Sequence, residues 1–178
     1  MAYYRFEGDY RDTSSSATSH HGTSPGGENI IGGGIHGHAL CLRDQAAPTQ
    51  AVTLGDHADF DFGSSTDFTV SLWFQRLGTM EDNSSLGGSS PDATILSSKN
   101  WASGSNVGWG IFTTSDGGVK WNYSDGTTRK DHTINAGFGS EGVADGQWHN
   151  LVVTHDRDGL ARFYIDGISK GSTSISGL

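Results

Sequence analysis

Hydrophobic and polar positions alternate with a period of two along short segments of this chain, and glycine-rich turns separate the segments. Gln147–Asp156 is rich in β-branched and aromatic side chains, and Asp158-Gly159 follows with the positive φ that a tight hairpin turn needs. Apolar positions then alternate with polar ones at Ala161, Phe163 and Ile165. The pattern therefore predicts a β-hairpin over Asp145–Gly167, closed by a second turn at Asp166-Gly167.

The same alternation predicts a strand at Asp67–Arg76, with Phe68, Val70, Leu72 and Phe74 on one face. Two long polar connections are expected at Asp12–Gly34 and Leu77–Asp92. Shorter strands are expected at Tyr3–Glu7, His38–Arg43, Gln50–Leu54, Ala93–Ser98, Gly108–Thr114, Val119–Tyr123, Thr127–Ile134 and Ile168–Thr173. So many short strands between glycine turns predict an all-β fold, a two-sheet antiparallel sandwich.

Composition agrees with a single β-domain. The chain has 178 residues, with 27 glycines for turns and 33% hydrophobic residues for a core. The net charge of −9, with the 11 basic residues scattered along the chain, argues against a nucleic-acid partner. No apolar run is long enough to insert into a membrane. Met1 leads directly into Tyr3-Tyr4-Arg5-Phe6 without a signal peptide, so we expect either that a leader was removed or that the protein does not cross a membrane by the secretory route.

The cysteine and the histidines do not indicate a reactive or metal-binding site. Cys41 is the single cysteine and lies in a predicted strand, so we expect a buried free thiol. None of the eight histidines is spaced like a known transition-metal motif. We expect structural roles for them, with His149 following a core-type tryptophan.

The order of these segments resembles the laminin G-like branch of the concanavalin A-type jelly-roll lectins and glucanases. The resemblance covers nearly the whole chain and implies one jelly-roll domain over residues 1–178. Most members of this family are non-catalytic modules that bind glycans or proteins, often with a structural calcium ion. The residues that carry the resemblance are Tyr4–Asp9, Asp12–Ser14, Gly37–Leu40, Ala51–Leu54, Asp67–Phe74, Ile95–Lys99, Trp109–Ile111, Gly146–His149 and Tyr164–Gly167.

The resemblance also implies strands beyond the end of this chain. Relatives make further strands after the turn that corresponds to Ile165-Asp166-Gly167, whereas only 11 residues follow Gly167 here. Either the last strands are absent or come from another chain, including a second copy of this one, or the N-terminal strand closes the sheet differently.

A calcium site is predicted at the end of the first strand. Glu7, Asp9 and Asp12 bring three hard oxygen ligands within six positions, and calcium takes 6–8 oxygens. In the family that this chain resembles, a site near this junction commonly holds calcium. The alternative is an ordinary acidic turn, in which Asp12 accepts hydrogen bonds from the backbone of Thr13-Ser14.

A glycan site is predicted in the polar loop Lys99–Asn106, where Trp101 offers an indole on which a sugar ring could stack. Asn100 and Asn106 flank it with amide groups. Trp121 is a further candidate, although its alternation with Tyr123 favours the core and Asn122 faces the other way. Trp73 and Trp148 are expected to be packing residues.

Catalysis is not expected. Glycoside hydrolysis usually needs two carboxylates across the scissile bond, yet no two of the four glutamates are two or four residues apart on a strand. Asp59 and Asp61 alternate as such a pair would, but a solvated face explains them better.

Three functions follow in order of preference. The first is a non-catalytic module that binds a carbohydrate, a glycan or glycoprotein partner, with structural calcium. The alternative is a structural or adhesion protein of a surface assembly, such as a virion decoration or fibre domain, which the missing signal peptide favours. A glucanase is third. The first two place the protein outside the cell or on a virion surface.

Overall fold

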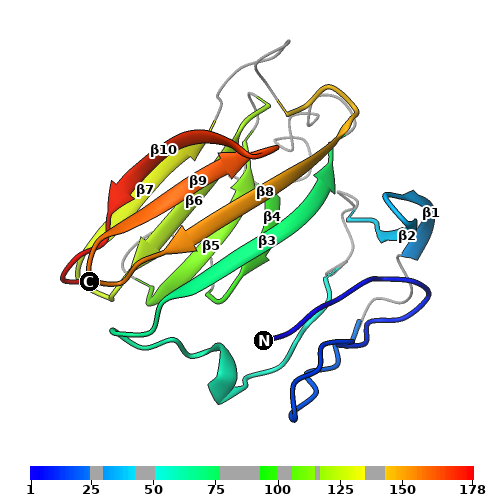
Figure 1. Cartoon of the computed structure of the whole chain (residues 1–178), viewed down its shortest axis with the longest axis horizontal. Helices are drawn as coiled ribbons and strands as arrows, with labels where there is room; N and C mark the ends of the chain where they lie inside the picture. The colour runs from blue at the N-terminus through cyan, green and yellow to red at the C-terminus, as the bar shows by residue number, and fades with distance from the viewer. Residues whose placement is uncertain (25–29, 43–50, 77–92, 100–105, 115–116, 135–142) are drawn as a thin grey trace, which may run out of the picture. The chain divides into compact units, whose positions relative to one another are not determined.

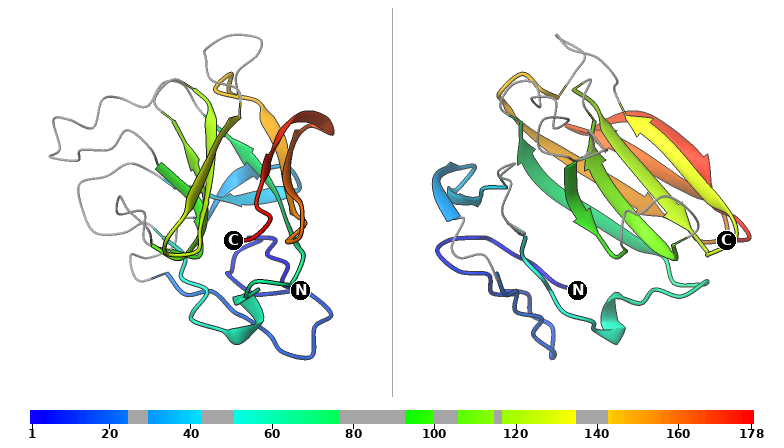
Figure 2. Two further views of the ribbon diagram at one scale, coloured as in Figure 1. Left: turned by 90° about the vertical axis from the view of Figure 1, so that its left-hand side faces the viewer. Right: turned by 180° about the vertical axis from the view of Figure 1, so that it is seen from behind.

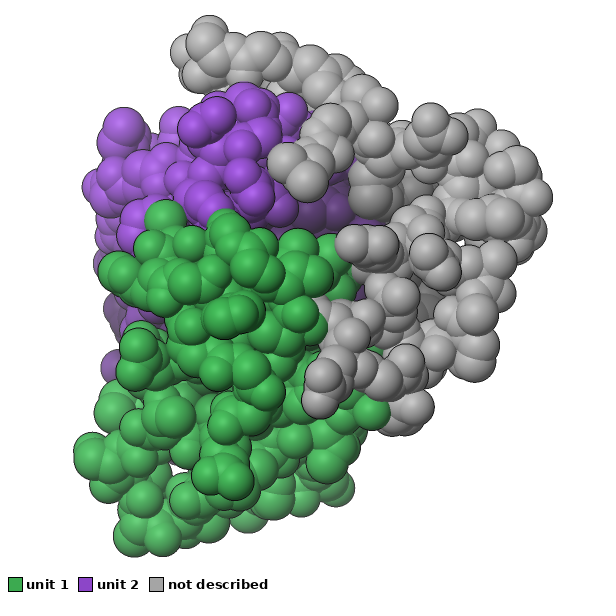
Figure 3. Space-filling model, turned by 90° about the vertical axis from the view of Figure 1, so that its right-hand side faces the viewer, with its two compact units in different colours: residues 1–61 green, residues 62–178 purple. Residues whose placement is uncertain are grey.

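The structure is a computed structural model that describes residues 1–24, 30–42, 51–76, 93–99, 106–114, 117–134 and 143–178. The chain divides into two compact units, Met1–Asp61 and Phe62–Leu178, which Figure 3 colours separately. Each unit is described by itself below. The single domain expected over residues 1–178 stays a prediction.

The second unit is built from eight described strands in two antiparallel sheets (Figure 1). One sheet has the order β10-β9-β8-β3 and the other the order β4-β5-β6-β7. The strands are β3 (Phe68–Gln75), β4 (Ala93–Ser97), β5 (Gly108–Thr113), β6 (Val119–Ser124), β7 (Arg129–Ile134), β8 (Trp148–His155), β9 (Leu160–Ile165) and β10 (Ile168–Ser174). These bounds confirm the all-β antiparallel sandwich and the strands predicted for this part of the chain.

The core lies between the two sheets, which appear as separate layers in the left view of Figure 2. Each strand alternates, so one set of side chains meets the opposite sheet and the other set points outward. The largest fully buried side chains of the core include Trp121, Phe163, Ile111, Ile134 and Leu151. The predicted inward set of β9 is confirmed, because Ala161 and Phe163 are 0% exposed and Ile165 is 4% exposed.

The two turns of the predicted hairpin form by different means. Asp166 and Gly167 both have positive φ, at 52° and 77°, as that turn requires. Gly159 does not have the positive φ that was expected; its backbone N–H donates to the Asp156 carbonyl at 3.0 Å instead. A side chain at Gly159 would clash with the Asp156 carboxylate, 2.6 Å from the place of its Cβ. The glycine therefore leaves room for this carboxylate, which ends a half-exposed side chain.

The expectation that Trp73 is a packing residue is wrong. Phe68 and Phe74 of β3 are buried, but Trp73 is 51% exposed. The cause is the alternation itself: Trp73 shares the outward face with Thr69, Ser71 and Gln75. Trp148, which pairs with Gln75, is half-buried on the same outer face.

The first unit has little regular structure. Strands β1 (Ile30–Gly34) and β2 (Gly37–Leu40) form a two-stranded sheet, and a short 3-10 helix, η1, covers Ala58–Phe60. The predicted strand Tyr3–Glu7 is wrong: its only described pairing is the bridge from Tyr4 to Asp12. Phe6 has a positive φ of 56°, which interrupts an extended chain.

Two further predictions fail in the first unit. The described part of Gln50–Leu54 makes one bridge, between Thr53 and Thr23, and no strand. Conversely, β1 lies inside the connection Asp12–Gly34, where the run of glycines concealed it. The connection predicted at Leu77–Asp92 lies outside the described residues. No helix in the described part of the chain is long and apolar enough to cross a membrane.

Candidate functional site

The outward side of the sheet β4-β5-β6-β7 gathers polar side chains, and we call it the β4–β7 face. Ser97, Gly110, Asn122 and Asp131 are aligned across its four strands by register. A second row joins Gly108, Ser124 and Arg129, and a third joins Phe112, Lys120 and Thr133. Because Val119, Trp121 and Tyr123 of β6 enter the core, Lys120, Asn122 and Ser124 point to the opposite side.

Asn122 is the unusual residue of this face. Its side chain is 0% exposed, and in the described part of the chain neither its amide nitrogen nor its amide oxygen has a hydrogen-bond partner. A buried polar group without a partner costs about 1–3 kcal/mol, so native structures hold few of them. Because the amide is 0% exposed, a ligand can reach it only if the groups that cover this part of β6 move aside.

Two glycines shape the face next to Asn122. A Cβ on Gly110 would lie 2.3 Å from Cζ of Phe112, so the phenyl ring packs directly over this glycine. A Cβ on Gly108 would lie 3.0 Å from Cβ of Lys99 and 2.8 Å from Oγ of Ser98. The absence of side chains at Gly108 and Gly110 therefore lets Lys99 and the ring of Phe112 lie close to the sheet.

Charged side chains lie at one end of the β4–β7 face. The guanidinium of Arg129 donates through Nε to Oδ1 of Asp131 at 3.0 Å. Burial lowers the pKa of Lys99, the positive charge of Arg129 lowers it further, and Asp131 opposes both effects. The Lys99 ammonium donates to the carbonyl of Asn106 at 3.2 Å.

The predicted glycan-binding residues separate into three groups. Asn106 is exposed and contacts Lys99, so it borders the β4–β7 face. Asn100 and Trp101 lie outside the described residues. Trp121 is 0% exposed, and its Nε1 donates to Nε2 of His155 at 3.0 Å, so it serves the core and offers no surface for a sugar ring.

The predicted calcium ligands have separate partners. Glu7 accepts from the backbone N–H and the ring of His38, at 3.2 and 3.1 Å. Asp9 accepts from the backbone N–H of Arg11 at 3.1 Å. Among the residues that the structure describes, no group of three His, Cys, Asp or Glu side chains could hold a metal ion. Calcium binding stays a prediction from the sequence.

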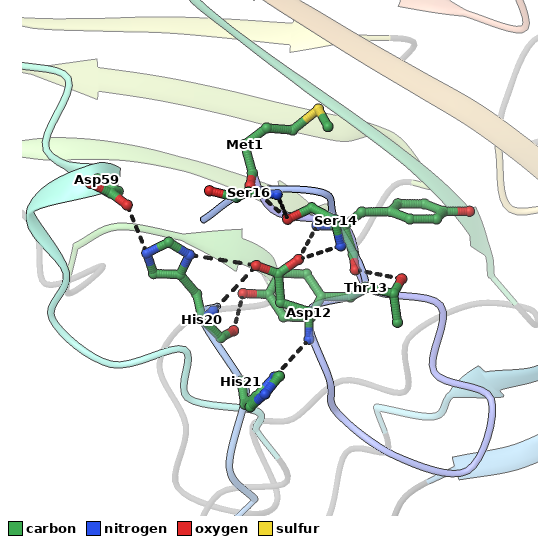
Figure 4. A network of polar contacts seen from close by, with 10 residues as sticks. Met1, Asp12, Thr13, Ser14, Ser16, His20, His21 and Asp59 are labelled. Carbon is green, nitrogen blue, oxygen red and sulfur yellow. Dashed lines mark hydrogen bonds and ion pairs between the residues drawn. The ribbon is translucent and has the colours of Figure 1, made fainter. Parts of the chain in front are cut away.

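Asp12 instead organises the backbone around it (Figure 4). Its Oδ1 accepts from the N–H groups of Tyr3 and Ser14, both at 2.9 Å, and its Oδ2 accepts from that of His20 at 3.2 Å. The contact to Ser14 is the acidic turn considered from the sequence. Burial raises the pKa of Asp12, but these donors lower it more and hold it well below its usual range.

His20 links two acidic side chains in the same unit (Figure 4). Its Nδ1 lies 3.5 Å from Oδ2 of Asp12, and its Nε2 lies 3.0 Å from Oδ2 of Asp59. Asp59 lies in η1 and is half-exposed, while His20 is buried. Asp59 therefore does not alternate with Asp61 on a strand, as a catalytic pair would.

The histidines of the second unit have structural partners. His149 contacts Asp166 through Nδ1 at 2.7 Å and Asp145 through Nε2 at 3.1 Å. His155 stacks on Phe68 with ring centroids 3.9 Å apart and accepts from Trp121. Both arrangements agree with the structural roles predicted from the sequence.

The sequence indicated which way Asn122 faces but did not identify it as a site residue. The sequence around Asn122 does not show that its outward-facing amide is buried. Alternation gives the direction of a side chain, whereas burial depends on what lies over the sheet.

Fold and site together define a β-sandwich domain with a polar face on one sheet. A family model described as the concanavalin A-like lectin/glucanases superfamily matches residues 45–178. The chain belongs to this superfamily, which confirms the resemblance. A comparison with curated protein sequences gives no match.

Solved structures share the fold at low identity. The binding domain of Paraclostridial Mosquitocidal Protein 1 has 18% identity and a TM-score of 0.71, over 93% of this chain and 37% of that one. The Botulinum Neurotoxin serotype G binding domain has 19% identity and a TM-score of 0.69, over 94% of this chain and 37% of that one. This chain thus spans well under half the length of either structure.

Proposed function

We propose that this chain is a non-catalytic recognition module that binds a carbohydrate on the β4–β7 face. The observation that carries the proposal is the buried amide of Asn122, which has two donors and an acceptor and no partner in the described part of the chain. It lies in one row with Ser97 and Asp131. A hydroxyl-rich ligand that displaced the cover of Asn122 would satisfy its amide.

The chemistry of the face fits a sugar better than an apolar ligand. Sugar hydroxyls both donate and accept, as does the amide of Asn122, whereas the hydroxyl of Ser97 already donates to the carbonyl of Lys99 at 2.6 Å and accepts from its N–H at 3.0 Å. Asp131 supplies an acceptor whose orientation Arg129 fixes. The predicted platform at Trp101 belongs to the loop between Lys99 and Asn106, both of which border this face.

Two considerations support binding without catalysis. Solved structures of the same fold are described as binding domains, and one as the receptor binding domain of botulinum neurotoxin D, with 18% identity and a TM-score of 0.62. A glycosidase needs two carboxylates near the scissile bond, whereas strands β4 to β7 contain one, Asp131. The proposal places the protein where glycans are displayed, outside a cell or on a virion.

The test is a glycan array, followed by titration calorimetry of each hit with the protein and with Asn122→Leu. We expect Asn122→Leu to weaken binding at least tenfold. Because the substitution removes an unpartnered buried amide, the melting temperature should stay level or rise.

Asn150→Leu is the matched control. Asn150 lies on β8, and its amide donates to the carbonyl of Leu72 at 3.3 Å, so this substitution should leave affinity unchanged. An array without hits, or equal affinity of Asn122→Leu and the unmodified protein for every hit, would overturn the proposal.

A further inference from the structure

We propose that two copies of this chain associate through the open edge of strand β3, so that their β10-β9-β8-β3 sheets join into one continuous sheet. The two β3 strands run antiparallel about a two-fold axis at Leu72. This association does not depend on carbohydrate binding. Three features support it: the difference between β3 and the other edge strands, the direction of the backbone groups of β3, and the complementarity of β3 to itself.

The other edge strands of the second unit are protected against pairing. Strand β10 carries Lys170 and a register shift within the strand. It also lies beside β7, because the ring of His132 contacts the hydroxyl of Thr173 at 3.0 Å and the carbonyl of Lys170 at 3.2 Å. Strand β4 has a register shift of its own. Bulges, charges and covering elements are the usual means by which an edge strand avoids a further strand.

Strand β3 lacks these protections. Its eight residues, Phe68–Gln75, pair with β8 in unbroken register and include neither a charged residue nor a proline. No described strand pairs with its other side, where β3 forms an edge of the sheet (Figure 1). Trp73 on this strand is 51% exposed, and aromatic side chains are enriched at interfaces. A flat, uncharged edge of this length is a template for an added strand.

Every second residue of β3 directs its backbone N–H and C=O to the open edge. In an antiparallel ladder both groups of a residue face the same side, and successive residues alternate. The side-chain amide of Asn150 donates to the carbonyl of Leu72 at 3.3 Å, and the N–H of Gly146 donates to the carbonyl of Arg76 at 3.1 Å. Leu72 and Arg76 therefore face β8. The residues that face the open edge are Thr69, Ser71, Trp73 and Gln75.

Strand β3 is complementary to a second copy of itself. A two-fold axis at Leu72 pairs Ser71 with Trp73 of the second copy and Thr69 with Gln75 of the second copy. These residues all face the open edge, so each pair exchanges two backbone hydrogen bonds. Each pair also places a small polar side chain beside a larger one on the outer face. On the inner face apolar residues meet apolar residues, because this register keeps the two faces apart.

The assembly closes at two chains. The other described edge strands of the second unit are protected, so each copy offers one edge, and a contact across a two-fold axis uses both. Each chain carries a net charge of −9, so two copies repel each other at long range. The uncharged β3 edge holds them together against this repulsion. Salt that screens the repulsion therefore strengthens the dimer.

Sedimentation velocity measures the association at roughly 5 and 500 µM protein and at about 50 and 500 mM salt. We expect a monomer that converts to a dimer as the protein concentration rises, and a Kd that falls about threefold or more at the higher salt. A monomer under every condition would overturn the proposal. A dimer that weakens with salt would also overturn it, because the contact would then be ionic. Assemblies larger than a dimer would contradict the closed contact.

Ser71→Asp tests the location, because it adds a negative charge beside the open edge. We expect it to raise the Kd about tenfold or more. Ser174→Asp is the matched control: Ser174 is exposed on β10, at the opposite edge of the same sheet, and the added charge is the same. It should change the Kd less than twofold. Equal effects of the two variants would show that total charge acts and that β3 is not the interface.

Ser71→Pro is a second variant at this position. Proline removes the N–H that faces the open edge and leaves the N–H groups that face β8 in place. We expect a folded monomer, with the melting temperature as the check of folding. Ser71→Asp carries the test if the proline variant does not fold. A folded Ser71→Pro protein that still forms the dimer would overturn the proposal.

Hydrogen exchange of the β3 amides at both protein concentrations tests the pairing itself. We expect Ser71 and Trp73 to gain protection at the higher concentration, whereas Val70 and Leu72 are protected at both, because their N–H groups face β8. A gain without this alternation would show a contact that does not pair the backbone. Protection of Ser71 and Trp73 in a monomer would show that the chain itself covers the edge. Either result would overturn the proposal.

Discussion

At the scale of single residues, burial and partners decide what each side chain does more than its chemical type. Trp73 and Trp121 show this for one residue type. Both occupy strands with alternating patterns, yet Trp73 is 51% exposed and Trp121 is 0% exposed. The sequence predicted the alternation correctly, with Trp73 on the face opposite Phe68 and Phe74, but the expectation that Trp73 is a packing residue was wrong.

The two tryptophans predict opposite effects on stability. Trp121→Ala should destabilise the protein by about 3–5 kcal/mol, because it leaves a large cavity and removes the donor to His155. Trp73→Thr should change the free energy of unfolding by less than about 1 kcal/mol, because the side chain already contacts water. Urea unfolding of both variants checks this. Equal losses would show that the outer face of β3 is covered in solution.

Asp12 gives a second prediction at this scale. Asp12→Ala leaves the N–H groups of Tyr3, Ser14 and His20 without their acceptor, so we expect a loss of about 1–3 kcal/mol in the first unit. Asp9→Ala is the control, because Asp9 is exposed and contacts Arg11, two residues along the chain. Hydrogen exchange of the amides of residues 3, 14 and 20 reports the change directly. Protection that survives Asp12→Ala would contradict the prediction.

At the scale of elements, hairpins with strong alternation were predictable and the irregular segments were not. The pairing of β8 with β9 needs only local pattern and a turn, both visible in the sequence. The segment around Phe6 was predicted as a strand because its letters alternate. Nothing in the local pattern indicates that Phe6 has a positive φ of 56°. In the candidate site, Asn106 was predicted, whereas Asn122 required knowledge of burial.

His149 of β8 contacts Asp166 in the turn between β9 and β10. Burial lowers the pKa of His149, but its contacts to Asp166 and Asp145 raise it more, so the net shift is upward. A histidine with a raised pKa contributes stability that is present below about pH 6.5 and is lost as the pH rises through its folded value. His149→Gln should therefore be less stable than the unmodified protein at pH 5.5 and approach it at pH 8.5.

Thermal melts at both pH values check the His149 prediction. Hydrogen bonds from Gln147 and His149 lower the pKa of Asp145. Burial raises the pKa of Asp166, but hydrogen bonds from His149 and Asn150 lower it more. Their contribution is lost only as the pH falls below about 3.8, outside this range. A gap between the two proteins that widens toward pH 8.5 would contradict the assignment.

At the scale of the whole molecule, the sequence predicted the all-β class, the family and the strands of the second unit. It did not predict the division at Asp61, because no change in composition marks it. Strands can be predicted from the sequence because their apolar residues alternate with a period of two and are often β-branched or aromatic. A segment held by single bridges and side-chain contacts, such as Tyr3 to Asp12, has neither.

The pH dependence of global stability tests the core as a whole through His155. Burial lowers the pKa of His155 to about 4, and the nearby Arg157 guanidinium contributes to the decrease. Above about pH 6.5 the ring is neutral in both the folded and the unfolded chain. Between pH 6.5 and 4, His155 is protonated in the unfolded chain but stays neutral in the folded chain. The free energy of unfolding therefore falls by about 3 kcal/mol over this interval.

His155→Gln removes this titration while keeping an acceptor for Nε1 of Trp121. We expect the variant to be less stable at pH 7.5 because the stacking of His155 on Phe68 is lost. Its free energy of unfolding should nevertheless fall less steeply between pH 6.5 and 4, by up to about 1.4 kcal/mol per pH unit. Urea unfolding across this range measures the slope, with His36→Gln as the control for an exposed histidine. Parallel curves for His155→Gln and the unmodified protein would mean that His155 is protonated within the folded core, and that the core opens to admit the proton.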